Sequence, residues 1–154
     1  MSDPRTELLN DHAEAERLLH LLEQSVEGND CCADLRAVWS KVEAMLLDHM
    51  RTEERFLFAH VADAHRAELE VLRAEHVLIR AALSKLGVEL DLHSLRKPEV
   101  EALTAFVRRH AELENRTLYR WLAEKPEAGF QAAVHRMIRN RAKPGEADDT
   151  ARRT

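Results

Sequence analysis

Hydrophobic residues recur along most of this chain at alternating steps of three and four positions, a spacing that places them on one face of an α-helix. Four such stripes run through residues 8–26, 39–56, 69–90 and 103–121. Pro98 fits the first turn of the last helix, where a proline loses no helical hydrogen bond. Phe56 and Trp121 end the second and fourth stripes and are predicted to pack in the core. Four long helices joined by short connections predict an all-α fold, an antiparallel up-down-up-down four-helix bundle.

The part of the chain after the fourth stripe is predicted to have two segments. Residues 127–141 follow Pro126 and carry a shorter amphipathic pattern, which predicts a short fifth helix at the C-terminal end. Residues 142–154 are polar, and we expect a disordered tail there. The chain has 154 residues, 45% of them hydrophobic, which suits one domain with one sizeable core. We place that domain at residues 1–141.

Composition and charge exclude several classes of protein. The formal net charge is −5, so a nucleic-acid partner is not expected. No apolar run reaches the roughly 18 residues that a membrane span needs, so a membrane partner is not expected either. The only cysteines, Cys31 and Cys32, are adjacent, a spacing unsuited to a mutual disulfide. We expect a reduced, cytoplasmic, helical protein whose oligomeric state the sequence leaves open.

Histidine interrupts each hydrophobic stripe once, and a glutamate follows two of these histidines four residues later. The histidines are His12, His49, His76 and His110, and the glutamates are Glu53 and Glu114. Residues four apart share a helix face, so both glutamates are expected to point toward the core with their histidines. Counting residues from each turn places the four histidines within about one helical turn of a common height, or about 5 Å. The six side chains are therefore predicted to meet inside the bundle.

Imidazole and carboxylate groups in a dry interior are costly unless they are paired, neutralised or bound to metal. Donors of these two kinds, without thiolate, suit iron, manganese or zinc. Six donors exceed the four of a closed tetrahedral zinc site and better match two metal ions bridged by one or both glutamates. Two alternatives are histidines satisfied as ordinary core residues and a metal-free network of histidine and glutamate. Glu16, four residues after His12, is either an extra donor or solvated.

The order of these residues resembles the hemerythrin-like (HHE cation-binding) domain, which has one histidine on helix one, His-x-x-x-Glu on helix two, one histidine on helix three and His-x-x-x-Glu on helix four. The resemblance covers roughly residues 8–121 and includes the local runs Asn10-Asp11-His12, residues 49–58, Glu75-His76 and His110-Ala111-Glu112-Leu113-Glu114. It implies a non-haem di-iron centre with a bridging oxygen species. By position, the four histidines would be terminal iron ligands, and at least one of Glu53 and Glu114 would bridge the two irons.

Helix three differs from that of the oxygen-carrying members of the family that this chain resembles, in which two histidines stand four residues apart on this helix. Here Leu72 precedes His76 and Arg80 follows it. One iron is therefore expected to lack a histidine, or to take a donor such as Glu16 or water, which favours a reactive iron over reversible O2 carriage. The resemblance implies a small-molecule partner (O2, hydrogen peroxide or NO) and either catalase-like peroxide breakdown or gas and redox sensing. Iron handling, a zinc or manganese site without redox catalysis, and a plain structural bundle are the alternatives.

Overall fold

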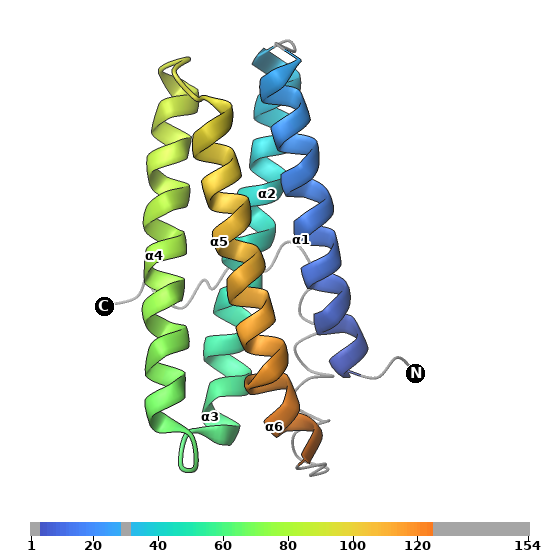
Figure 1. Ribbon diagram of the computed structural model, residues 1–154, viewed down its shortest axis with the longest axis vertical. Helices are drawn as coiled ribbons and strands as arrows, with labels where there is room; N and C mark the ends of the chain where they lie inside the picture. Colours follow the sequence, from blue (N-terminus) through green and yellow to red (C-terminus); the bar gives the residue numbers. More distant parts are fainter. Residues whose placement is uncertain (1–3, 29–31, 125–154) are drawn as a thin grey trace, which may run out of the picture.

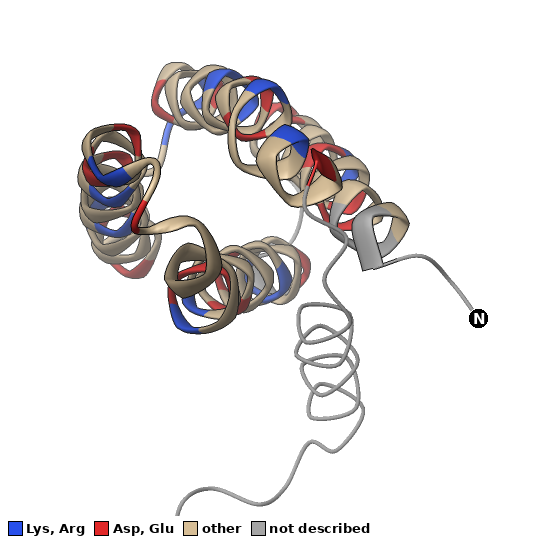
Figure 2. Ribbon diagram, turned by 90° about the horizontal axis from the view of Figure 1, so that it is seen from below, with Lys and Arg blue, Asp and Glu red and all other residues tan. Residues whose placement is uncertain are grey.

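The computed structural model describes residues 4–28 and 32–124, and within these ranges it is helical and contains no strand. Four long segments run side by side around a common centre (Figure 1, and end-on in Figure 2). The elements are α1 (Pro4–Glu27), α2 (Cys32–Thr52), η1 (Glu53–Leu57), α3 (Phe58–Val61), α4 (Arg66–Asp91), α5 (Lys97–Arg116) and α6 (Leu118–Glu124). Helix α1 packs against α2 and α5, and α4 packs against the same two helices. The antiparallel four-helix bundle predicted from the hydrophobic spacing is confirmed.

The predicted C-terminal segments fall beyond the region that the structure describes. The fifth helix expected at residues 127–141, the tail at 142–154 and the domain boundary at 141 all lie outside it. The short helix α6 is a separate feature, which continues the line of α5 at the lower end of the bundle (Figure 1).

The hydrophobic core consists of two clusters, one above and one below the level at which the predicted histidines and glutamates lie. The upper cluster is the larger and includes Leu19, Trp39, Leu46, Leu83 and Leu103. The lower cluster is built from Leu57, Phe58, Val61, Leu69, Leu72, Leu118, Tyr119 and Leu122. The polar layer therefore has apolar side chains on both sides of it.

A π-helical turn changes which residues face the core after Glu53. The turn spans Glu53–Leu57, and such turns insert one extra residue into a helix. As a result Leu57 and Phe58 are fully buried, whereas Phe56 is only partly buried. Phe56 still packs against the lower cluster, as predicted, although the extra residue of the turn leaves it only partly buried.

A second irregularity follows Glu114 on the opposite side of the bundle. Helix α5 ends at Thr117, whose φ and ψ are −114° and −86°, and whose hydroxyl donates to the carbonyl of Leu113 at 2.7 Å. The change of direction buries Leu118 and Tyr119 and leaves Trp121 only partly buried, stacked on His65 with a centroid distance of 3.7 Å. Trp121 nevertheless packs against the lower cluster, as predicted.

Acidic and basic residues both occur along each of the long segments (Figure 2). Among the helices of residues 4–28 and 32–124, none is both long and apolar enough to cross a membrane.

Candidate metal centre

The six residues predicted to meet inside the bundle do so, between the upper and lower clusters. Glu53, His76 and Glu114 are 0% exposed, and His49 and His110 are also buried. His12 is the most open of the six, with 13% of its side chain exposed. Together they form two groups whose possible ligand atoms lie within 4.8 Å of one another: His12, His49, Glu53 and Glu114 in one, and Glu53, His76, His110 and Glu114 in the other. We call these the His12–His49 group and the His76–His110 group.

Both glutamates belong to both groups, and each presents one carboxylate oxygen to each. Glu114 Oε2 lies 3.0 Å from His12 Nε2, while its Oε1 lies 2.8 Å from His110 Nε2 and 3.3 Å from His76 Nε2. Glu53 Oε1 lies 3.3 Å from His49 Nε2, and its Oε2 lies 3.4 Å from His76 Nε2. The geometry therefore matches two carboxylates placed to bridge two metal ions, with two imidazoles left for each ion.

Three of the four histidines are oriented by a carboxylate on the ring nitrogen that faces away from the centre. His49 Nδ1 lies 3.2 Å from Asp11, His76 Nδ1 lies 2.8 Å from Glu54, and His110 Nδ1 lies 2.6 Å from Glu75. An Nδ1–H that donates to a carboxylate leaves Nε2 free to bind a metal and fixes the plane of the ring. His12 differs, because its buried Nδ1 has no hydrogen-bond partner.

Arg80 fixes one of these orienting carboxylates in turn. Its guanidinium donates to both oxygens of Glu54, at 2.9 and 3.0 Å. Burial alone would raise the pKa of Glu54, but the hydrogen bonds from Arg80 and His76 lower it below its usual value. Glu54 is thus held as the ionised acceptor that His76 needs.

Tyr119 joins the centre from α6, a contact that the hydrophobic spacing did not predict. Its hydroxyl donates to Glu53 Oε1 at 2.6 Å and lies 3.3 Å from His12 Nε2, and its ring stacks on that of His12. Burial is the main cause that raises the pKa of Tyr119 well above its usual value, and the nearby carboxylates of Glu53 and Glu114 add to it. Tyr119 is therefore a neutral phenol that donates a hydrogen bond into the His12–His49 group.

In the metal-free centre, the carboxylates favour protonated histidines, and the histidines favour ionised carboxylates. Burial favours neutral imidazole, yet hydrogen bonds with Glu114 and Glu53 outweigh it and raise the pKa of His76 to about 9. The same kind of interaction raises the pKa of His49, chiefly through the charge of Glu53. The pKa of Glu114 is well below its usual value because four histidines surround it, although its burial acts in the other direction.

The donor set also fits metal ions. Among the described residues, Glu53 Oε2 and His110 Nε2 are buried without a well-formed hydrogen bond, although His76 Nε2 lies 3.4 Å from the first and Glu114 Oε1 lies 2.8 Å from the second. Unpartnered polar atoms are rare in protein interiors, and a cation bound between them would satisfy both. Two imidazoles and two carboxylates per ion suit iron, manganese or zinc, with room for further ligands on each.

The other candidate donors considered in the sequence lie away from the centre. Glu16 forms an exposed ion pair with Arg108 at 2.8 Å and belongs to neither group. Leu72, which stands where the oxygen carriers of the resembled family have a second histidine, is buried in the lower cluster. Each group nevertheless contains two histidines, so the described part of the centre shows no imbalance in imidazole between its two sides.

Comparison with known families agrees with this site. The family model described as the hemerythrin HHE cation-binding domain matches residues 3–122. The chain belongs to the hemerythrin HHE family. Searches of curated proteins and of solved structures gave no match. The HHE match extends from the start of α1 into α6, so it includes all six residues of the centre and also Tyr119.

The hydrophobic spacing did not predict the carboxylates that orient the histidines of the HHE centre. They nevertheless have a simple signal in the sequence. Asp11 and Glu75 each directly precede a histidine of the centre, and Glu54 directly follows a glutamate of it. Neighbours along a helix point about 100° apart, so such a carboxylate faces the adjacent helix and reaches the histidine there. Tyr119 has no comparable signal, because its position depends on the irregular backbone at Thr117.

Proposed function

We propose that this HHE protein binds two iron ions and that the resulting centre binds or reacts with O2, hydrogen peroxide or NO. The observation that carries the proposal is the shared pair of glutamates, each with one oxygen toward each pair of histidines. Two iron ions in these positions would supply redox chemistry toward small oxygen and nitrogen species.

The protein supplies rigid ligands and a dry surrounding. Asp11, Glu54 and Glu75 keep three histidines in the orientation in which Nε2 faces inward, and the two hydrophobic clusters keep water from above and below. Preformed ligands with fixed orientation favour a centre that keeps its metals while a small molecule comes and goes.

Tyr119 holds a proton beside the His12–His49 group. Its hydroxyl contacts Glu53 and approaches His12, so a small molecule bound on that side would lie near a phenolic donor. Such a donor can stabilise negative charge that develops on the bound molecule. This arrangement supports reaction with peroxide or O2 as well as simple binding.

A metal site without redox catalysis is the second candidate function. Affinity alone does not select iron over zinc or manganese for imidazole and carboxylate ligands. In that case the bundle would handle or store a cation without redox catalysis. As for location, the cytoplasm expected from the adjacent cysteines remains our proposal.

Reactivity distinguishes these functions. The iron-loaded protein should show near-ultraviolet absorption that the zinc-loaded protein lacks, and this absorption should change when hydrogen peroxide, O2 or NO is added. Steady consumption of peroxide without loss of iron would identify an enzyme, and a reversible spectral change without turnover would identify a sensor. An iron-loaded protein that responds to none of the three, like its zinc-loaded control, would contradict the proposal and favour the cation-handling alternative.

A further inference from the structure

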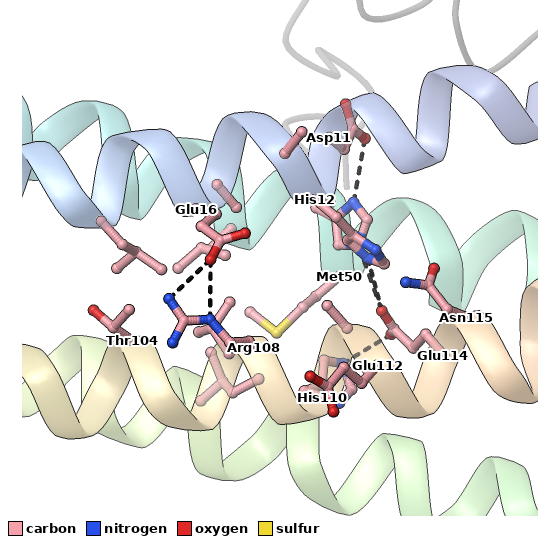
Figure 3. Close-up of a pocket in the computed structure, with 18 residues that line it drawn as sticks. Asp11, His12, Glu16, Met50, Thr104, Arg108, His110, Glu112, Glu114 and Asn115 are labelled. Carbon is pink, nitrogen blue, oxygen red and sulfur yellow. Dashed lines mark hydrogen bonds and ion pairs between the residues drawn. The ribbon is translucent and has the colours of Figure 1, made fainter.

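A cavity of about 340 Å3 adjoins the candidate metal centre between α1 and α5 (Figure 3). His12, His49 and Glu114 line its inner end, together with His110. The cavity therefore reaches all of the His12–His49 group except Glu53. The Glu16–Arg108 ion pair links α1 to α5 at the part of the cavity that lies away from the metal centre, as Figure 3 shows.

The walls of the cavity are apolar and come from all four long helices. They include Leu19 on α1, Leu46 and Met50 on α2, Ile79 on α4 and Val107 on α5. Such a surface gains free energy by contact with another apolar surface rather than with water. Its size suits an organic molecule, because a water molecule or a diatomic gas fills only ~30 Å3, whereas pockets for small organic ligands start at roughly 300 Å3.

Charges around the cavity favour a neutral ligand. Outside the two metal-ligand groups, the charged residues among the described lining are Asp11, Glu16, Arg108 and Glu112. Asp11 pairs with His49, Glu16 with Arg108, and Glu112 with Arg116 at 3.2 Å. The last two pairs are exposed and solvated, so the buried wall outside the two metal-ligand groups is apolar. A charged body would lose its hydration against that wall without a balancing charge, which is costly.

We propose that this cavity binds a small uncharged organic molecule with an apolar body, held with one end beside His12 and His49. The proposal deepens the proposed function by giving the centre a second, organic ligand, and it rests on that function only for the metals at the inner end. It makes a claim about size and charge that can be tested by binding alone.

Calorimetric titration of the metal-loaded protein with benzyl alcohol, and with benzyltrimethylammonium as a charged counterpart that cannot ligate a metal, tests the proposal. Benzyl alcohol is expected to bind at least about tenfold more tightly than benzyltrimethylammonium, a difference of about 1.4 kcal/mol. Ala111→Phe places a ring in the cavity from α5 and should weaken benzyl alcohol binding at least about tenfold. Ala105→Phe adds the same ring on an exposed part of α5 outside the lining and should leave binding unchanged.

Thr104→Leu provides a second filling variant, should Ala111→Phe fail to fold. Thr104 lines the cavity away from the centre, and its hydroxyl donates only to the carbonyl of Val100 within its own helix. Absence of benzyl alcohol binding, or equal binding to the filled and unfilled variants, would overturn the proposal. Metal content measured on the same samples separates the two proposals: binding without iron removes only the di-iron function, and iron without binding removes only the organic ligand.

Discussion

The two sides of the centre have the same donors in different surroundings. In the His76–His110 group both histidines are buried and each is oriented by a glutamate, one of which is held by Arg80. In the His12–His49 group, His12 is 13% exposed and has no partner on Nδ1. This second group also faces the cavity and contacts the hydroxyl of Tyr119.

Holding a metal in a fixed geometry and admitting a small molecule place different demands on the ligands. A ligand fixed by a second hydrogen bond holds its metal in one geometry, whereas a ligand without one can move with less cost. We infer that the His76–His110 side anchors a metal and that the His12–His49 side admits the small molecule. Substitutions can test this difference, and the one with the largest expected effect removes a ligand that both sides share.

Glu114→Ala is expected to have the largest effect, because Glu114 contributes to both groups. It should abolish binding of both metals and so remove the stability that metal binding provides, about 3 kcal/mol at an excess of metal over Kd. The melting temperature should fall by roughly 10 °C. Elemental analysis and thermal unfolding give both readings.

Glu112→Ala is the matched control for that variant. Glu112 is an exposed residue of the same helix and pairs only with Arg116 among the described contacts. Its substitution should change neither metal content nor melting temperature appreciably. Equal loss of metal from both variants would show that the effect comes from α5 as a whole and not from the shared carboxylate.

Replacing one histidine on each side should show that the two sides differ in stability and in metal retention. His76→Ala removes a fully buried ring that contacts both glutamates and is expected to cost about 3 kcal/mol of stability and the metal of its own side. His12→Ala removes a partly exposed ring whose place water can take, so it should cost about 1 kcal/mol and leave the anchored metal bound. Urea unfolding and metal content measure the pair, and a more damaging His12→Ala would reverse our assignment of the two sides.

Weakening one of the carboxylates that orient the histidines should have a smaller effect on metal binding. Glu75→Gln keeps the shape of the side chain but weakens the hydrogen bond to His110, and loss of such a partner lowers metal affinity by about 10- to 100-fold. Glu70→Gln, at an exposed position of the same helix, is the control. Competition with a chelator of known affinity measures the change, and unaltered affinity in Glu75→Gln would mean that orientation of His110 does not matter.

Tyr119→Phe should be the mildest of these changes in binding and should act on one side alone. It removes the hydroxyl that donates to Glu53 while leaving the ring in the lower cluster, so we expect about 1 kcal/mol of lost stability and two metals still bound. Reaction with peroxide should slow while metal content stays constant. Because Tyr119 is the only tyrosine in the chain, loss of tyrosine absorption confirms the variant directly. Unchanged reactivity would remove Tyr119 from the proposed role.

The sequence was sufficient to predict the bundle and the six residues that meet in it, because both follow from helical periodicity. His49 and Glu53, or His110 and Glu114, share a face wherever a helix is regular. Burial departs from the periodic pattern where that regularity ends: beyond the π-helical turn at Glu53–Leu57 and the break at Thr117, Phe56 and Trp121 pack against the lower cluster but are only partly buried.

The contacts between helices were less predictable than the ligands themselves. Asp11, Glu54 and Glu75 reach histidines on neighbouring helices, and these distances depend on rotation of each helix about its axis, which spacing along the chain does not define. Tyr119 depends in addition on the backbone angles of one residue. Glu16 shows the converse, because helical spacing allowed it to face inward while Arg108 on α5 pairs with it at the surface.

The central claim is that two metal ions share Glu53 and Glu114, and metal stoichiometry tests it most directly. Protein produced in iron-supplemented medium should be analysed for iron, manganese and zinc by elemental analysis, with the protein concentration determined by amino-acid analysis. We expect two metal ions per chain, one for each group, and iron as the metal. One metal ion or none in a folded protein would contradict the claim, because the buried carboxylates would then not be shared between two ions.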